Sequence, residues 1–121
     1  MWSVGIELDF AAAHLIPNHP KCGKLHGHNY RTEIRLLGDA LNSMGFLIDF
    51  GDLKAAASNV IAALDHSFLN ESIPKEYQPT SAEHIAAYIH HNLSESLGNR
   101  VKLEMFVRVW ETQSSWAEYG P

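Results

Sequence analysis

Three of the eight histidines in this 121-residue chain follow a pattern that could hold a metal ion. His14 closes one segment, and His26 and His28 follow it with a single glycine between them. Residues two positions apart in an extended strand project from the same face, so the last two rings would point together. Three imidazoles leave a fourth tetrahedral position open for water or substrate. The pattern favours a catalytic zinc site over three unrelated polar residues, although this ligand type also suits iron or nickel.

The only cysteine, Cys22, precedes His26 by four residues and has three interpretations. As a buried small hydrophobe it would be inert. As a fourth ligand it would close the metal site. As an unliganded thiol beside a metal ion and a histidine it would form a thiolate, which is a base or a nucleophile. Spacing alone leaves all three open.

Two further groups could carry chemistry. Asp65 and His66 directly follow a predicted helix, where a histidine either complements the helix dipole or, oriented by the aspartate, transfers protons near neutral pH. Glu111 continues the odd-numbered apolar stripe of residues 101–109. A carboxylate at the end of a buried stripe is unfavourable unless it is paired. It therefore either emerges into solvent or receives a ligand with adjacent N–H donors.

Alternating apolar residues predict the strands that position these groups. Period-two patterns run over 6–10, 28–36 and 101–109, with shorter strands at 46–48 and 116–119. On parity, His14 shares the face of Phe10, unless a bulge among the intervening alanines changes this.

Two helices are expected between the strands. Asp49 is a plausible N-cap for a helix that runs to Leu64, and residues 80–83 have capping-box spacing ahead of a helix that ends at Gly98. The order strand, strand, helix, helix, strand, strand predicts an α+β domain with helices on one face of an antiparallel sheet.

Composition limits the classes of function. The length predicts a single domain over residues 1–121. A net charge of −5 argues against nucleic-acid binding, and no apolar run approaches the ~20 residues that span a bilayer. Residues 1–7 lack the features of a signal peptide, and a single cysteine forms no internal disulfide. We therefore expect a cytoplasmic protein without nucleic-acid or membrane partners.

Several motifs occur in the order known from one enzyme family. They are Phe10–His14, the Cys-x-x-x-His-Gly-His-Asn-Tyr run of 22–30, Ile48–Phe50, Leu64–His66, Leu69–Asn70, Pro79–Thr80 and Glu111–Thr112. On these residues the chain resembles the 6-pyruvoyltetrahydropterin synthase / 6-carboxytetrahydropterin synthase (QueD) family over essentially its whole length, with a looser match in 113–119.

The resemblance implies a tunnelling fold, with a four-stranded antiparallel sheet, two helices on one face, and subunits joined into a barrel. It implies a homohexamer built from two trimers, with active sites between subunits. Closing the sheets between subunits would also remove exposed strand edges.

The resemblance also assigns roles to single residues. The zinc ligands map onto His14, His26 and His28, and the catalytic base maps onto Cys22. The catalytic Asp-His pair maps onto Asp65 and His66, contributed across a subunit boundary. Glu111 is the expected pterin anchor, and Thr80 or Ser81 is the expected hydroxyl contact with the substrate.

The implied activity is a zinc-dependent lyase reaction on 7,8-dihydroneopterin triphosphate. The short loops resemble compact bacterial members that make 6-carboxy-5,6,7,8-tetrahydropterin for queuosine synthesis; the alternative product is 6-pyruvoyltetrahydropterin. Members devoted to folate synthesis usually carry glutamate in place of the cysteine, so Cys22 argues against that branch. A non-catalytic pterin- or zinc-binding module is the alternative from another class, but such a module needs no proton-transfer residues.

Overall fold

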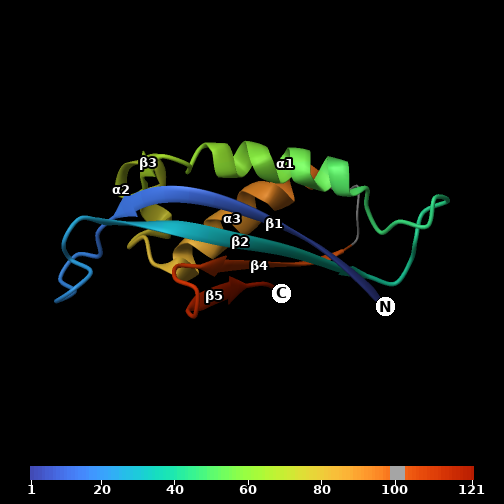
Figure 1. The fold of residues 1–121 in the computed structure, drawn as a ribbon. Helices are drawn as coiled ribbons and strands as arrows, with labels where there is room; N and C mark the ends of the chain where they lie inside the picture. Colours follow the sequence, from blue (N-terminus) through green and yellow to red (C-terminus); the bar gives the residue numbers. More distant parts are fainter. Residues whose placement is uncertain (99–102) are drawn as a thin grey trace.

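Two long strands form the centre of the molecule (Figure 1). The structure is a computed structural model that describes residues 1–98 and 103–121. β1 (Trp2–His14) and β2 (His26–Gly38) pair antiparallel from end to end, with Trp2 opposite Gly38 and His14 opposite His26. The register is continuous, so no bulge interrupts the alanines and the parity argument for His14 is confirmed.

Within the described ranges the sheet has five strands, in the order β3-β1-β2-β4-β5. β4 (Glu104–Trp110) lies antiparallel to β2, and β5 (Trp116–Tyr119) lies antiparallel to β4. The fifth strand, β3 (Ser67–Phe68), pairs parallel with the end of β1. The prediction of a four-stranded, purely antiparallel sheet is therefore corrected. A two-residue strand is too short for a periodic pattern to reveal it.

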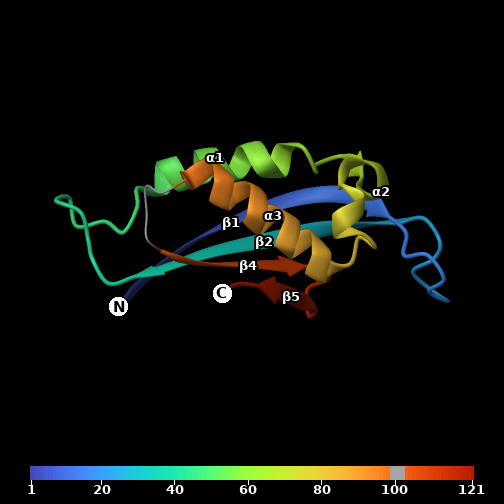
Figure 2. The same cartoon turned by 180° about the vertical axis from the view of Figure 1, so that it is seen from behind.

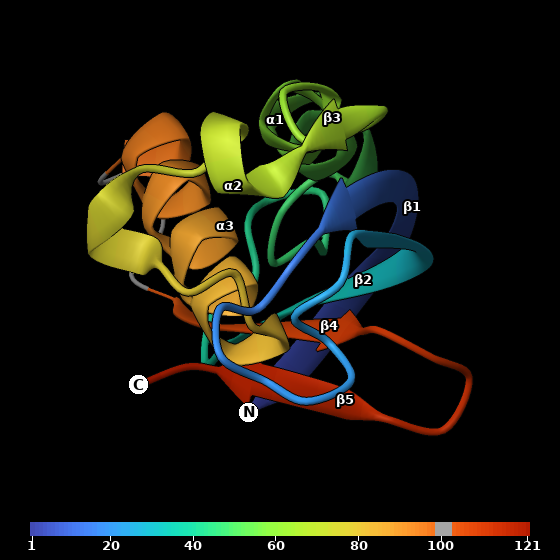
Figure 3. The same cartoon turned by 90° about the vertical axis from the view of Figure 1, so that its left-hand side faces the viewer.

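Both long helices cover the same side of the sheet (Figures 2 and 3). α1 (Phe50–Ala62) begins where predicted, because the Asp49 carboxylate accepts the backbone N–H groups of Gly51 and Asp52. α3 (Ala82–Leu97) ends at Gly98, whose φ of 58° suits glycine. Between them lie α2 (Leu69–Ser72) and a short 3₁₀ helix (Lys75–Tyr77), neither of which was predicted.

Three local predictions need correction. Residues 46–48 form no strand, because Asn42 closes a turn by accepting the N–H groups of Met44 and Phe46 with its side chain. The N-cap of α3 is Ser81 rather than Thr80, because the Ser81 hydroxyl accepts the N–H of His84. The third helical residue is then His84 instead of Glu83, so the predicted capping box does not form. The predicted strand of 101–109 begins at Glu104, and its first two positions lie outside the described residues.

The core fills the space between the helices and one face of the sheet. Even-numbered residues of β1 and β2 and odd-numbered residues of β4 point into it, and they meet apolar side chains from both long helices. Its largest fully buried side chains include Tyr30, Ile34, Leu36, Leu53, Ile85, Ile89, Leu93 and Val107. His14 sits on this same buried face at the end of β1. In the described part of the chain, no helix combines the length and apolar character needed to cross a membrane.

Candidate active site

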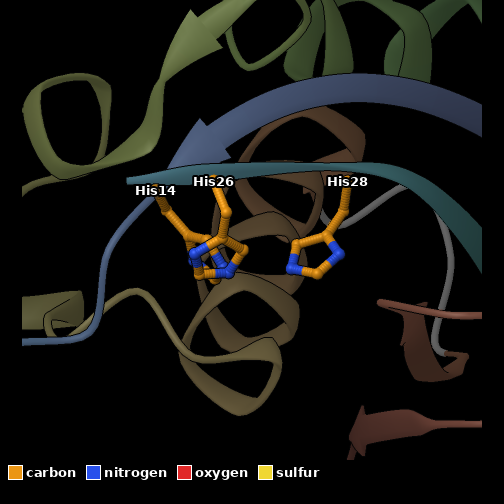
Figure 4. Close-up of side chains that lie close together, drawn as sticks. All are labelled: His14, His26 and His28. Carbon is orange, nitrogen blue, oxygen red and sulfur yellow. The ribbon is translucent and has the colours of Figure 1, made fainter. Parts of the chain in front are cut away.

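His14, His26 and His28 come together at the paired ends of β1 and β2 (Figure 4). Each ring offers a nitrogen, and the three nitrogens lie within 4.8 Å of one another. Ring centroids are separated by 4.6 Å for His14 and His26, 5.2 Å for His14 and His28, and 4.8 Å for His26 and His28. Strand pairing produces this cluster, since it sets His14 opposite His26 and the alternation of β2 places His28 on the same face.

Backbone carbonyls orient two of the three rings. His14 donates its Nδ1–H to the Thr80 carbonyl over 2.8 Å, and His26 donates its Nδ1–H to the Lys24 carbonyl over 2.7 Å. A carbonyl can only accept, so each bond places the proton on Nδ1 and leaves the Nε2 lone pair free. Such bonds from the second ring nitrogen are typical of histidines that bind metals.

The Nε2 atoms of all three rings are buried and lack a hydrogen-bond partner among the described residues. Burial lowers the pKa of His14 and of His28, with nearby Glu111 opposing the shift, so both rings favour the neutral form that coordinates metal. Buried polar atoms are rarely left without a partner. Three imidazoles with convergent Nε2 atoms fit a divalent metal ion, and a metal would satisfy all three atoms at once.

Tyr30 packs against two rings of the cluster from the next inward-facing position of β2. It is fully buried, stacks on Phe10 at 4.8 Å, and contacts His28 and His14 edge-on at centroid distances of 5.3 and 6.0 Å. Burial raises the pKa of Tyr30, so its hydroxyl stays neutral. The ring restricts how far His28 can turn.

Glu111 stands at the side of the cluster, directly after β4. One of its carboxylate oxygens lies 3.4 Å from Nε2 of His28, and the side chain is only 26% exposed. The buried stripe that predicted this position is present at Met105, Val107 and Val109. Glu111 also lines a hollow between the start of α3 and the β4–β5 turn, with Ala82, Glu83, Ser115, Trp116, Ala117 and Glu118. The carboxylate is therefore available to a ligand in that hollow.

Thr80 and Ser81 occupy different environments. Thr80 is fully buried; its carbonyl holds His14, and its hydroxyl donates to the side-chain oxygen of Asn70 over 3.4 Å. Ser81 is half-buried at the start of α3, where its oxygen accepts the His84 N–H, and its own hydrogen finds no acceptor among the described residues.

Asn70 is a site residue to which the sequence analysis assigned no role. Its side chain accepts the Leu15 N–H and donates to the Leu15 carbonyl, both over 3.0 Å. Asn70 thus fixes the backbone directly after His14 and also contacts Thr80. The Leu69–Asn70 motif was a signal for it, but only the fold reveals that these segments meet.

Cys22 lies half-buried in the loop that joins β1 to β2. Among the described residues, the group of side chains close enough to share a metal consists of His14, His26 and His28, without Cys22 or Glu111. This arrangement favours the open site over one closed by the cysteine.

Asp65 and His66 form an oriented pair at the edge of β1. The Ala11 N–H donates to the Asp65 carboxylate over 2.9 Å, and that hydrogen bond, together with His66, lowers the pKa of Asp65. The same carboxylate oxygen lies 2.9 Å from Nδ1 of His66, and the His66 side chain is 83% exposed. His66 adopts a left-handed backbone with φ of 57°, an uncommon conformation for a residue other than glycine.

This pair does not join the histidine cluster within one chain. His66 and Ser67 line a shallow hollow together with residues 11–13 of β1 and 27–29 of β2, His28 among them. The odd-numbered side chains there lie on the face of the sheet opposite to the one from which His14, His26 and His28 project. Among the described residues, the side chains close enough to share a metal include neither Asp65 nor His66.

Comparisons with known proteins agree with this arrangement. A model of the 6-pyruvoyl tetrahydropterin synthase family matches residues 3–121. A protein of Archaeoglobus fulgidus is 44% identical over 115 residues, which cover 95% of this chain and 92% of the relative. A Synechocystis protein named 6-carboxy-5,6,7,8-tetrahydropterin synthase is 39% identical over 125 residues, which cover 98% of this chain and 93% of the relative.

Among solved structures, Caenorhabditis elegans 6-pyruvoyl tetrahydropterin synthase superposes with a TM-score of 0.82 at 26% identity. The match covers 100% of this chain and 97% of the nematode chain, so the two share the tunnelling fold. Family match, relatives and fold agree, and the chain belongs to the 6-pyruvoyl tetrahydropterin synthase family.

Proposed function

We propose that the protein is a zinc-dependent 6-carboxy-5,6,7,8-tetrahydropterin synthase. It would convert 7,8-dihydroneopterin triphosphate to 6-carboxytetrahydropterin, acetaldehyde and triphosphate, in a step that feeds queuosine biosynthesis. The observation that carries this proposal is the convergence of three buried Nε2 atoms, each without a hydrogen-bond partner in the described residues. The name of the Synechocystis relative supports the carboxy product.

Glu111 would bind the pterin ring in the hollow beside the histidines. The 2-amino and N3–H groups of a pterin form a two-donor edge, and a carboxylate accepts both bonds in one plane. The hollow also includes the first residues of α3, next to which the Ser81 hydroxyl has a hydrogen that no described residue accepts. We therefore assign the substrate contact to Ser81, whereas Thr80 acts through His14.

Cys22 and the Asp65–His66 pair would move protons. Zinc bound at the histidines would polarise the side-chain hydroxyls of the substrate and acidify the adjoining C–H bonds. The Cys22 thiolate would remove a proton there. His66, held by Asp65, would exchange a proton at the opposite side of the substrate. A thiol with this task must stay reduced, and we therefore place the reaction in the cytoplasm.

Asp65 and His66 would serve the site of a neighbouring subunit in a homohexamer of two trimers. Support comes from the exposure of His66 and from the absence of both residues from the group of side chains that could share a metal, among the described residues. Subunits inactivated by Cys22→Ala and by His66→Ala should regain part of the activity when they exchange into mixed hexamers. Confirmed exchange without recovered turnover would argue for sites within one chain.

Mass spectrometry of the products from 7,8-dihydroneopterin triphosphate tests the reaction itself. The proposal predicts 6-carboxytetrahydropterin together with acetaldehyde. The second candidate, 6-pyruvoyltetrahydropterin, is favoured by the names of the family and of the nematode enzyme, and it would form without loss of carbon. Unchanged substrate in the presence of zinc would contradict both.

A further inference from the structure

His19 organises the loop that carries Cys22. This loop leaves β1 at His14 and enters β2 at His26, so both of its ends are at the histidine cluster. Its middle folds back on itself: the Ile16 N–H donates to the Cys22 carbonyl over 2.7 Å, and the Gly23 N–H donates to the His19 carbonyl over 3.0 Å. The loop therefore has a defined shape of its own.

The imidazole of His19 holds the loop by two hydrogen bonds. Its Nδ1 accepts the backbone N–H of Cys22 over 2.8 Å and that of Lys21 over 3.1 Å. Both partners are donors, so Nδ1 must carry the lone pair and the ring must be the neutral Nε2–H tautomer. Asn18, immediately before it, adopts a positive φ of 67°, which turns the chain sharply here.

The backbone is packed closely around the same residue. A Cβ atom at Gly23 would lie 2.5 Å from the His19 carbonyl oxygen and 3.3 Å from that of Ile16. Only glycine permits this approach. Cys22 is thus fixed on its N-terminal side by the hydrogen bond from its N–H to His19, and on its C-terminal side by the close packing of Gly23.

We propose that His19 is a positioning residue for Cys22. By accepting the Cys22 N–H, it fixes the backbone from which the thiol projects and keeps the thiol in register with the substrate held at His14, His26 and His28. The inference deepens the proposed function and rests on it for the role of the thiol. The hydrogen bonds that carry it do not depend on that role.

Asparagine can replace the acceptor. In this chain Asp49 already accepts N–H groups two and three residues ahead, at 2.7 and 3.4 Å, which is the pattern that His19 makes with Lys21 and Cys22. The side-chain oxygen of asparagine occupies nearly the position of a histidine Nδ1. His19→Asn should therefore retain the loop, whereas His19→Ala should release it.

The test compares His19→Ala, His19→Asn and, as a matched control, His91→Ala. His91 is an exposed histidine of α3 whose ring faces Glu95. Each variant is assayed as the zinc-loaded full chain for kcat, KM, zinc content and rate of alkylation by iodoacetamide. Cys22 is the only cysteine, so the alkylation rate reports on its thiol alone.

For His19→Ala we expect kcat to fall roughly tenfold with little change in KM, because a displaced base slows the chemical step. Alkylation should become faster and zinc content should stay at the wild-type level. His19→Asn and His91→Ala should behave like the wild type. Unchanged alkylation and kcat in His19→Ala, loss of zinc in that variant, or failure of His19→Asn to restore both readouts would overturn the inference.

Alkylation also separates this inference from the proposed function. A wild-type chain without pterin turnover, but with faster alkylation in His19→Ala alone, would contradict the proposed reaction and keep the loop assignment. Normal wild-type turnover with equal alkylation in every variant would contradict the role of His19 only.

Discussion

Replacing Asn70 by alanine should weaken both the fold and metal binding. The substitution removes two 3.0 Å hydrogen bonds to the backbone of Leu15 and the longer contact with the Thr80 hydroxyl. A typical net contribution is about 1 kcal/mol per bond, and half-buried Leu15 can recover part of it from water. We therefore expect a loss of about 2 kcal/mol in the free energy of unfolding.

The effect on metal binding follows from position. Leu15 is adjacent to His14, and Thr80 holds the Nδ1–H of that ring. If Leu15 and Thr80 are held less firmly, the His14 ring should sample a wider range of orientations. Substitutions of residues that support a metal ligand typically lower metal affinity by about 10–100-fold. We expect the lower end of this range, because the Thr80 carbonyl itself remains.

Urea unfolding followed by circular dichroism measures the first effect, and competition with a zinc-binding dye measures the second. Asn92→Ala is the matched control, since the Tyr88 carbonyl within α3 is the one partner that the Asn92 side chain has among the described residues, and alanine favours the helix there. A change below about 0.5 kcal/mol for Asn70→Ala, with wild-type zinc affinity, would refute the idea that Asn70 supports the ligand set.

Three further substitutions test other parts of the site and fold. Cys22→Ala should retain its zinc and bind substrate but lose turnover; loss of metal would make the cysteine a ligand. Glu111→Gln should lose on the order of 2–4 kcal/mol of substrate binding or transition-state stabilisation with unchanged zinc content, since an amide donor would face a substrate donor; near-normal kinetic constants would mean that the pterin is held elsewhere. Burial lowers the pKa of His90 in the folded chain. As pH falls below about 6.5, His90 is therefore protonated more readily in the unfolded chain, and the folded state loses stability. The urea midpoint of the metal-free wild type should therefore fall more than that of His90→Gln between about pH 7.5 and pH 5.5, and parallel curves would exclude His90 as the cause.

The central part of the fold was predictable because its signals are periodic. Alternation identified the long strands, Asp49 marked the start of α1, and Gly98 marked the end of α3. β3 and α2 escaped prediction because elements of two and four residues contain less than one period of any pattern. The segment 46–48 looked like a strand only because its apolar residues follow one another, whereas Asn42 holds the preceding turn.

The site could be predicted where spacing determines geometry. The His-x-His spacing placed His26 and His28 on one face, and strand parity added His14. The supporting shell could not be predicted, since the contacts of Thr80 and Asn70 join segments more than 50 residues apart in the chain. No local pattern encodes such pairings. That the group able to share a metal includes neither Asp65 nor His66, among the described residues, likewise became visible only in the folded chain.

X-ray absorption at the zinc edge of the purified, zinc-loaded protein identifies the atoms that bind the metal. We expect one zinc per chain with three imidazole nitrogens at about 2.0–2.1 Å, completed by oxygen from water or substrate. The spectrum of His26→Ala should lose one nitrogen or the metal altogether. A sulfur neighbour at about 2.3 Å would place Cys22 in the coordination sphere and contradict an open site with a free catalytic thiol.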